Sequence, residues 1–138
     1  VESSEAPFKL LACGSRFTTE GSLDSWGTFP EALNALHDAL DTRQVEGVVF
    51  LSGDIHRSLF RENPRASGYP IPELTSSPMA RPNPASSTCA AEAGVSFCYR
   101  GNSFMVLDIT PTELTATLHE EDGAILHTEI ISRSSLAY

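Results

Sequence analysis

The sequence predicts an α/β fold with a mixed sheet, one main helix and a C-terminal antiparallel β-meander. Residues 8–13 and 48–51 are short apolar runs typical of strands. Between them, Leu33, Leu36 and Leu40 recur at helical spacing, which indicates a helix with one apolar face. A strand, a helix and a second strand in this order form a crossover, which places the two strands parallel and side by side.

The predicted helix begins near Thr28, which fits a capping box with Glu31, and fades near Asp41. Residues 61–72 contain several prolines and a glycine, so we expect a loop there. Residues 78–88 are rich in proline, serine and alanine and are predicted to form an exposed loop.

The end of the chain has the pattern of a β-meander. Residues 103–109 are predicted to form one strand, and residues 114–119 and 124–131 the two strands of a hairpin. Asp122-Gly123 lies between the last two, and this dipeptide is a strong signal for a tight hairpin turn.

Charge and composition exclude several classes of protein. The formal net charge is −9, the pI is about 4.7, and the 138 residues suffice for a single domain, residues 1–138. Nucleic acids and anionic membranes attract basic surfaces, so we expect neither as a partner. No stretch approaches the ~20 apolar residues that span a bilayer, so no transmembrane segment is expected. The acidic start, which lacks Met, indicates a processed product or a fragment without a secretory signal.

The cysteines leave the compartment open between two possibilities. Cys89 and Cys98 flank a short polar stretch and can close a small disulfide loop, which would indicate an extracellular or periplasmic location. The alternative is that they and Cys13 are unpaired thiols in a reducing cytoplasm. The chain contains no C-x-x-C pair, so a structural zinc knuckle is not expected.

The strongest candidate site is Gly53-Asp54-Ile55-His56, directly after the apolar run 48–51. In an extended chain alternate side chains point the same way, so Asp54 and His56 would reach one site. Gly53 has no Cβ and lets backbone or ligand come close. A carboxylate oxygen beside an imidazole suits a divalent or trivalent metal ion. The alternative is that Asp54 caps a turn and His56 is a polar surface residue.

Four segments of the chain resemble one family of enzymes, the PhoD-like alkaline phosphatases of the calcineurin-like metallophosphoesterase superfamily. They are Phe8-Lys9-Leu10-Leu11, Asp24-Ser25-Trp26, residues 48–58 (VVFLSGDIHRS), and residues 69–78 (YPIPELTSSP). The resemblance covers nearly all of this chain but only the C-terminal part of the family's catalytic domain. It implies the C-terminal half of a layered α/β/β/α sandwich and metal-dependent phosphoester hydrolysis, as in an alkaline phosphatase or phosphodiesterase.

The resemblance also implies roles for individual residues. Asp54 and His56 match the family's late metal-binding motif, and they would be metal ligands and catalytic residues. A two-metal centre, with calcium or iron suspected, would hold the phosphate and activate a water molecule. Arg57 is the candidate for substrate binding, although alternation sends it away from His56 and favours an ion pair on the far side. The superfamily's earlier motifs do not occur here, so the other ligands would come from a missing N-terminal portion or a companion chain.

A second function is compatible with the same pattern. A truncated β-rich module can bind a partner protein through an exposed sheet edge without any catalysis. The two hypotheses differ in one respect, because changes at Asp54 or His56 would abolish hydrolysis but leave partner binding intact. Among the other candidates, His119 and His127 flank the hairpin and could face each other as a structural pair.

Overall fold

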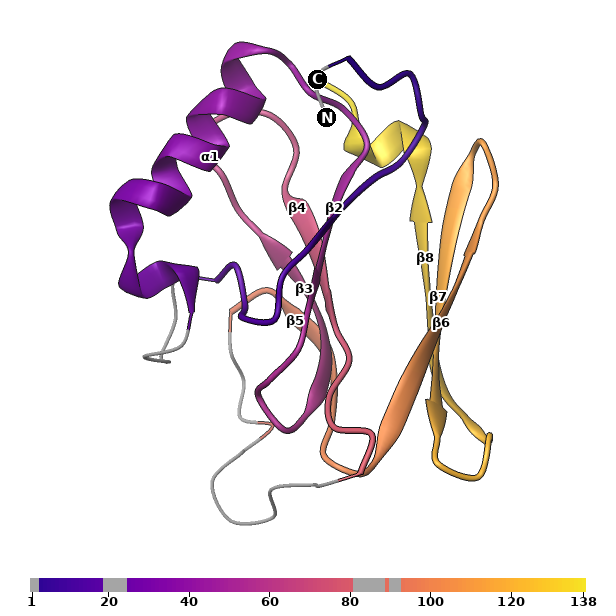
Figure 1. Ribbon diagram of the computed structural model, residues 1–138. Coiled ribbons are helices and arrows are strands. Elements are labelled where there is room, and N and C mark those ends of the chain that lie inside the picture. Colours follow the sequence, from indigo (N-terminus) through magenta and orange to yellow (C-terminus); the bar gives the residue numbers. More distant parts are fainter. Residues whose placement is uncertain (1–2, 19–24, 81–88, 90–92) are drawn as a thin grey trace.

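The computed structural model describes residues 3–18, 25–80, 89 and 93–138. It is a mixed α/β fold of three layers, in which a helix, a five-stranded sheet and a three-stranded sheet follow one another (Figure 1). The fold class predicted from the sequence is therefore confirmed. No helix in the described part of the chain has the length and apolar character needed to cross a membrane.

The five-stranded sheet has the order β1-β2-β4-β3-β5 and the three-stranded sheet the order β6-β7-β8. The elements are β1 (Lys9–Ala12), the 3-10 helix η1 (Trp26–Thr28), α1 (Pro30–Thr42), β2 (Val48–Ser52), β3 (Ser58–Asn63), β4 (Ile71–Thr75), β5 (Val95–Tyr99), β6 (Ser103–Ile109), β7 (Glu113–Glu120), β8 (Ile125–Ser132) and the 3-10 helix η2 (Arg133–Leu136).

The predicted crossover is present, since β1 and β2 pair in parallel and α1 connects them. Strand β4 lies parallel to β2 on its other side, whereas β3 runs antiparallel to β4. Val48, Val49 and Phe50 of β2 are completely buried, because α1 covers one face of the sheet and the meander the other. An apolar run without alternation is what a strand buried on both faces requires.

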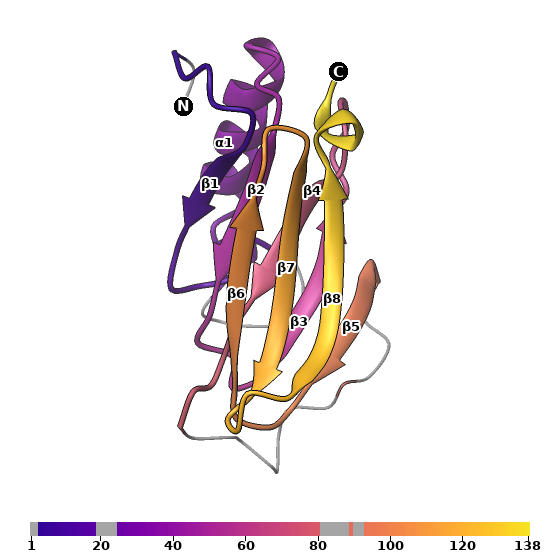
Figure 2. The same ribbon diagram turned by 90° about the vertical axis from the view of Figure 1, so that its right-hand side faces the viewer.

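The meander turns one face toward the five-stranded sheet (Figure 2). Leu114, Ala116 and Leu118 of β7 are completely buried and belong to the same core as β2. They alternate with partly exposed threonines, as the period of a strand with one buried face predicts. The turn at Asp122-Gly123 closes the hairpin as predicted, with Glu120 N–H donating to Ala124 O at 2.8 Å.

Three expectations about local structure were wrong. The segment 61–72 is not all loop, because β3 extends to Asn63 and β4 begins at Ile71. Strand β5 was not predicted at all. Helix α1 has Phe29 at its N-cap with no side-chain cap, so Thr28 does not form the expected capping box. Most of the predicted loop 78–88 lies outside the described residues.

Candidate functional site

The loops that follow β1, β2 and β4 meet at one edge of the five-stranded sheet, because these strands are parallel and their carboxyl ends point the same way. Gly53 N–H donates to Gly14 O at 3.2 Å, which joins the first two loops. Ser76 N–H donates to Ser52 O at 3.1 Å, which joins the second and third. This is the edge at which open α/β sheets place their ligands.

Asp54 and His56 lie in the middle loop, but not in the extended conformation that we expected. Strand β2 ends at Ser52, and φ is 63° at Asp54 and 54° at His56. Both residues therefore occupy the left-handed region, which non-glycine residues rarely adopt outside tight loops. The alternation of a strand does not govern these side chains, so the expectation of an extended chain at Asp54 and His56 was wrong. Asp54 is exposed and His56 is half-buried.

Backbone strain of this kind tends to persist only where the surroundings hold the chain firmly. Ser52 and Ser58, at the two ends of the loop, hold the chain through hydrogen bonds. The Ser52 hydroxyl donates to Glu73 Oε1 at 2.7 Å and lies 2.8 Å from Thr75 Oγ1. The Ser58 hydroxyl accepts a hydrogen bond from Ser77 N–H at 3.0 Å. Both anchors connect the loop of Asp54 and His56 to β4 and the residues after it.

Glu73 is a fully buried carboxylate at the centre of this arrangement. Besides the Ser52 hydroxyl, it accepts a hydrogen bond from Phe17 N–H at 2.9 Å and another from the Asn63 side-chain amide at 2.9 Å. A buried polar group is tolerated only when it is hydrogen-bonded, and here both side-chain oxygens accept hydrogen bonds. We did not predict this role for Glu73, although a lone carboxylate in the apolar strand Ile-Pro-Glu-Leu-Thr was a visible signal.

Cys13 and Trp26 border the same edge. The Trp26 indole N–H donates to Cys13 Sγ at 3.4 Å, and the Trp26 ring stacks on Phe17 with 5.1 Å between centroids. Trp26 therefore packs on the core and also reaches the loop after β1. Cys13 lines a hollow that Gly53 also borders.

Arg57 directly follows His56 and precedes β3, and it is only 8% exposed.

The two other histidine candidates lie in the meander. His119 and His127 do not face each other, because a register shift in the hairpin places Leu118 opposite His127 and Ile125 opposite His119. Adjacent residues of a strand point to opposite faces. His127 accordingly stacks on Phe97, at 4.2 Å between ring centroids, whereas His119 stacks on a residue of β6.

The donor types at the loop suit a metal ion, but the set is incomplete. A carboxylate oxygen and an imidazole nitrogen are ordinary ligands for calcium, iron or zinc. In the described ranges, no three His, Cys, Asp or Glu side chains lie together as a metal-binding group. Asp54 and His56 can therefore provide only part of a coordination sphere, and ligand roles for them stay predictions. Asp24, one of the residues of the family resemblance, lies outside the described residues.

Cys89 and Cys98 form a disulfide bond, so these two cysteines are not the unpaired thiols of the alternative. Cys98 belongs to β5, so the bond fixes Cys89 to the edge of the five-stranded sheet. Cys13 is a free thiol. A disulfide is compatible with an oxidising compartment.

Comparison with solved structures shows what this fold resembles. A structure of PhoD matches with a TM-score of 0.73 and 16% sequence identity, over 99% of this chain and 32% of that chain. GAP50, the anchor in the inner membrane complex of Plasmodium, matches with a TM-score of 0.69 and 12% identity, over 91% of this chain and 36% of that chain. No protein-family profile matches the sequence, and no curated protein matches it either.

These matches establish a shared fold. The identities of 16% and 12% are too low to carry a function, and the chain spans about a third of the length of either protein. One fold often hosts unrelated functions, and of the two similar structures GAP50 is described as an anchor. Function therefore has to be argued from the site.

Proposed function

We propose that this chain supplies the C-terminal part of the active site of a metal-dependent phosphoester hydrolase, an alkaline phosphatase or phosphodiesterase. One observation carries the proposal: in a fold shared with PhoD, the loop with Asp54 and His56 lies at the carboxyl edge of three parallel strands. Ligands of open α/β sheets bind at this edge.

Each residue has a chemical role in this proposal. The Asp54 carboxylate and one nitrogen of the His56 ring would bind metal, and the anchored loop holds both groups near the sheet edge before substrate arrives. A bound metal pair supplies Lewis acidity, which polarises the phosphoryl oxygen and lowers the pKa of a bound water. The Arg57 guanidinium is the proposed contact for the phosphate, since a planar fork of donors suits phosphate oxygens.

The remaining metal ligands would come from a companion portion, either an N-terminal segment of the same polypeptide or a second chain. The isolated 138 residues should then bind metal weakly and hydrolyse nothing. We further propose an extracellular or periplasmic location, because the Cys89–Cys98 disulfide is stable in such compartments.

The test uses the purified protein together with any companion polypeptide that co-purifies with it. The intact mass of each species identifies the companion. Hydrolysis of p-nitrophenyl phosphate and of its bis ester should need calcium, iron or another added metal and should stop with chelator. Asp54→Asn and His56→Ala should each lower kcat/KM by at least about 100-fold, because loss of a direct ligand should exceed the roughly 10–100-fold cost of losing a group that only orients a ligand. The control is His119→Ala, a histidine on the outer side of the meander, which should leave the rate unchanged.

Two results would overturn the proposal. One is full activity in both Asp54→Asn and His56→Ala. The other is a complete polypeptide with no phosphoesterase activity that binds a partner protein equally well with or without the two substitutions. The second result would support the alternative, a β-rich protein-binding module. GAP50, whose solved structure has a similar fold, is described as an anchor.

A further inference from the structure

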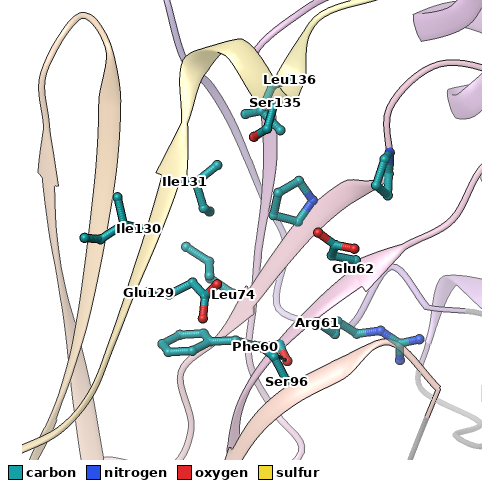
Figure 3. Close-up of a pocket in the computed structure, with 12 residues that line it drawn as sticks. Phe60, Arg61, Glu62, Leu74, Ser96, Glu129, Ile130, Ile131, Ser135 and Leu136 are labelled. Atoms are coloured by element: carbon teal, nitrogen blue, oxygen red, sulfur yellow. Dashed lines mark hydrogen bonds between the residues drawn. The ribbon is translucent and has the colours of Figure 1, made fainter.

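A second candidate site lies between the two sheets, and it shares no lining residue with the loop of Asp54 and His56. It is a cavity of about 170 Å³ between β3 and β4 on one side and β8 on the other (Figure 3). A cavity of this size holds a molecule the size of benzene. Its lining includes Phe60, Glu62, Leu74, Glu129, Ile131 and Leu136.

The floor of the cavity is apolar. Phe60 and Leu74 come from neighbouring strands of the five-stranded sheet and are 1% and 2% exposed. Ile131 on β8 and Leu136 on η2 are 6% and 1% exposed. The apolar part of a small molecule could therefore contact these side chains without displacing a polar group.

Glu129 breaks the apolar pattern on the inner face of the meander. It lies opposite Ala116 of β7, which is completely buried and faces the other sheet. Directly opposite residues of a sheet point to the same face, so the Glu129 side chain, which is 35% exposed, extends from the inner face of β8. Its partner is the Nε2 atom of His127, at 3.1 Å.

Glu62, the exposed residue of β3, adds a second carboxylate from the opposite sheet. Alternation along β3 puts Glu62 on the face of Phe60, which contacts His127 of β8, and puts Arg61 on the other face. Figure 3 shows the Glu62 carboxylate directed toward the cavity and the Arg61 guanidinium directed away from it. Arg61 Nη2 donates to Ala93 O at 3.3 Å. The side chains that face the cavity thus carry negative charge.

We propose that this cavity binds a small organic cation, an aliphatic ammonium whose chain is about six carbons long at most. The ammonium would lie between Glu62 and Glu129 and donate to both carboxylates. The alkyl chain would lie on Phe60, Leu74 and Ile131. Charge-assisted hydrogen bonds to two carboxylates, together with burial of the chain, favour a cation over a neutral or anionic molecule of the same shape.

The first experiment uses the unmodified 138-residue chain and three probes of equal length: hexylammonium, 1-hexanol and hexanoate. Amide chemical shifts are followed during titration, with sodium chloride added to match ionic strength. Hexylammonium should give saturable shifts confined to β3, β4 and β8, and should bind at least about fivefold more tightly than hexanol, since charged hydrogen bonds exceed neutral ones. Hexanoate should not bind.

The second experiment removes one charge at a time. Glu129→Gln and Glu62→Gln should each weaken hexylammonium binding roughly tenfold and leave hexanol unaffected. Glu113→Gln, at the exposed start of β7, is the matched control and should bind like the unmodified chain. Equal affinity for hexylammonium and hexanol, saturable shifts elsewhere, or no saturable shifts would each overturn the proposal. Because the probe series uses the unmodified chain, it decides the matter even if a variant fails to fold.

Discussion

The backbone N–H of Ser77 donates to the Ser58 hydroxyl at 3.0 Å, and this hydroxyl also lies 2.9 Å from Ser103 Oγ. Ser58 thus connects three segments that are far apart in the sequence: the end of the loop with His56, the loop after β4, and the start of β6. Ser58 and Ser103 are almost completely buried. The position of the candidate site is therefore coupled to the packing of the two sheets.

We predict that Ser58→Ala lowers the free energy of unfolding by roughly 1–3 kcal/mol, because it leaves the part-buried Ser77 N–H without its acceptor. It should also broaden or shift the amide resonances of residues 53–57. Urea unfolding and amide spectra measure the two effects. Ser135→Ala is the control, since its exposed hydroxyl lies in η2 and donates to the nearby Ser132 O. Equal stability of the two variants would contradict the prediction.

Glu73→Ala should be far more damaging. It removes the acceptor of three donors at once, namely Phe17 N–H, the Ser52 hydroxyl and the Asn63 amide. Each buried donor left unsatisfied costs about 1–3 kcal/mol, so we expect a loss of roughly 3 kcal/mol or more, or failure to fold. Thermal and urea unfolding measure it. Glu113→Ala, on the exposed end of β7, should change stability by less than about 0.5 kcal/mol.

The same residues explain why sequence reasoning missed β3. Its second half is Arg61-Glu62-Asn63, a polar run that indicates a loop. Asn63 is buried because Glu73, ten positions further along the chain, accepts its amide hydrogen bond. No local pattern contains that information. The parallel pair and the meander were predictable because their apolar periodicity and the Asp122-Gly123 turn are local signals.

The position of the candidate segment in the fold could be predicted from the sequence, but its backbone conformation could not. The Gly53-Asp54-Ile55-His56 segment does follow a buried strand and lie at the sheet edge, as expected. Its left-handed residues could not be foreseen, because they depend on anchors in the loops after β1 and β4. Alternation does not extend to Asp54 and His56, because they lie two and four residues beyond Ser52, the last residue of β2.

Reduction of the Cys89–Cys98 disulfide should destabilise the fold. The bond closes a loop with a sequence separation of 9, and the chain-entropy relation for a loop of this size gives roughly 2–3 kcal/mol. Unfolding by urea with and without dithiothreitol measures the difference. A double Cys89→Ser, Cys98→Ser variant should match the reduced protein and should not respond to dithiothreitol. A response in that variant would assign the effect to Cys13, the free thiol.

The contacts of the Asp41 carboxyl predict that the fold loses stability in acid. Burial alone would raise the pKa of its carboxyl and is the largest single influence, but hydrogen bonds from Tyr138 and Ser67 and the charge of Arg65 together outweigh it and lower the pKa. The two hydroxyls donate to the carboxylate at 2.7 Å each, and Arg65 forms an ion pair with it.

Because the pKa of Asp41 is lower in the folded state, the free energy of unfolding should fall in acid. A carboxyl whose pKa is lower in the folded state stabilises the fold above its unfolded pKa, near 3.8, and that contribution disappears as the pH falls through the folded value. Between about pH 6 and about pH 2, the unmodified chain should therefore lose more unfolding free energy than Asp41→Asn does. Tyr138→Phe, which removes one hydroxyl donor, should lose an intermediate amount. Parallel curves for all three proteins would mean that the Asp41 contacts do not stabilise the charged form.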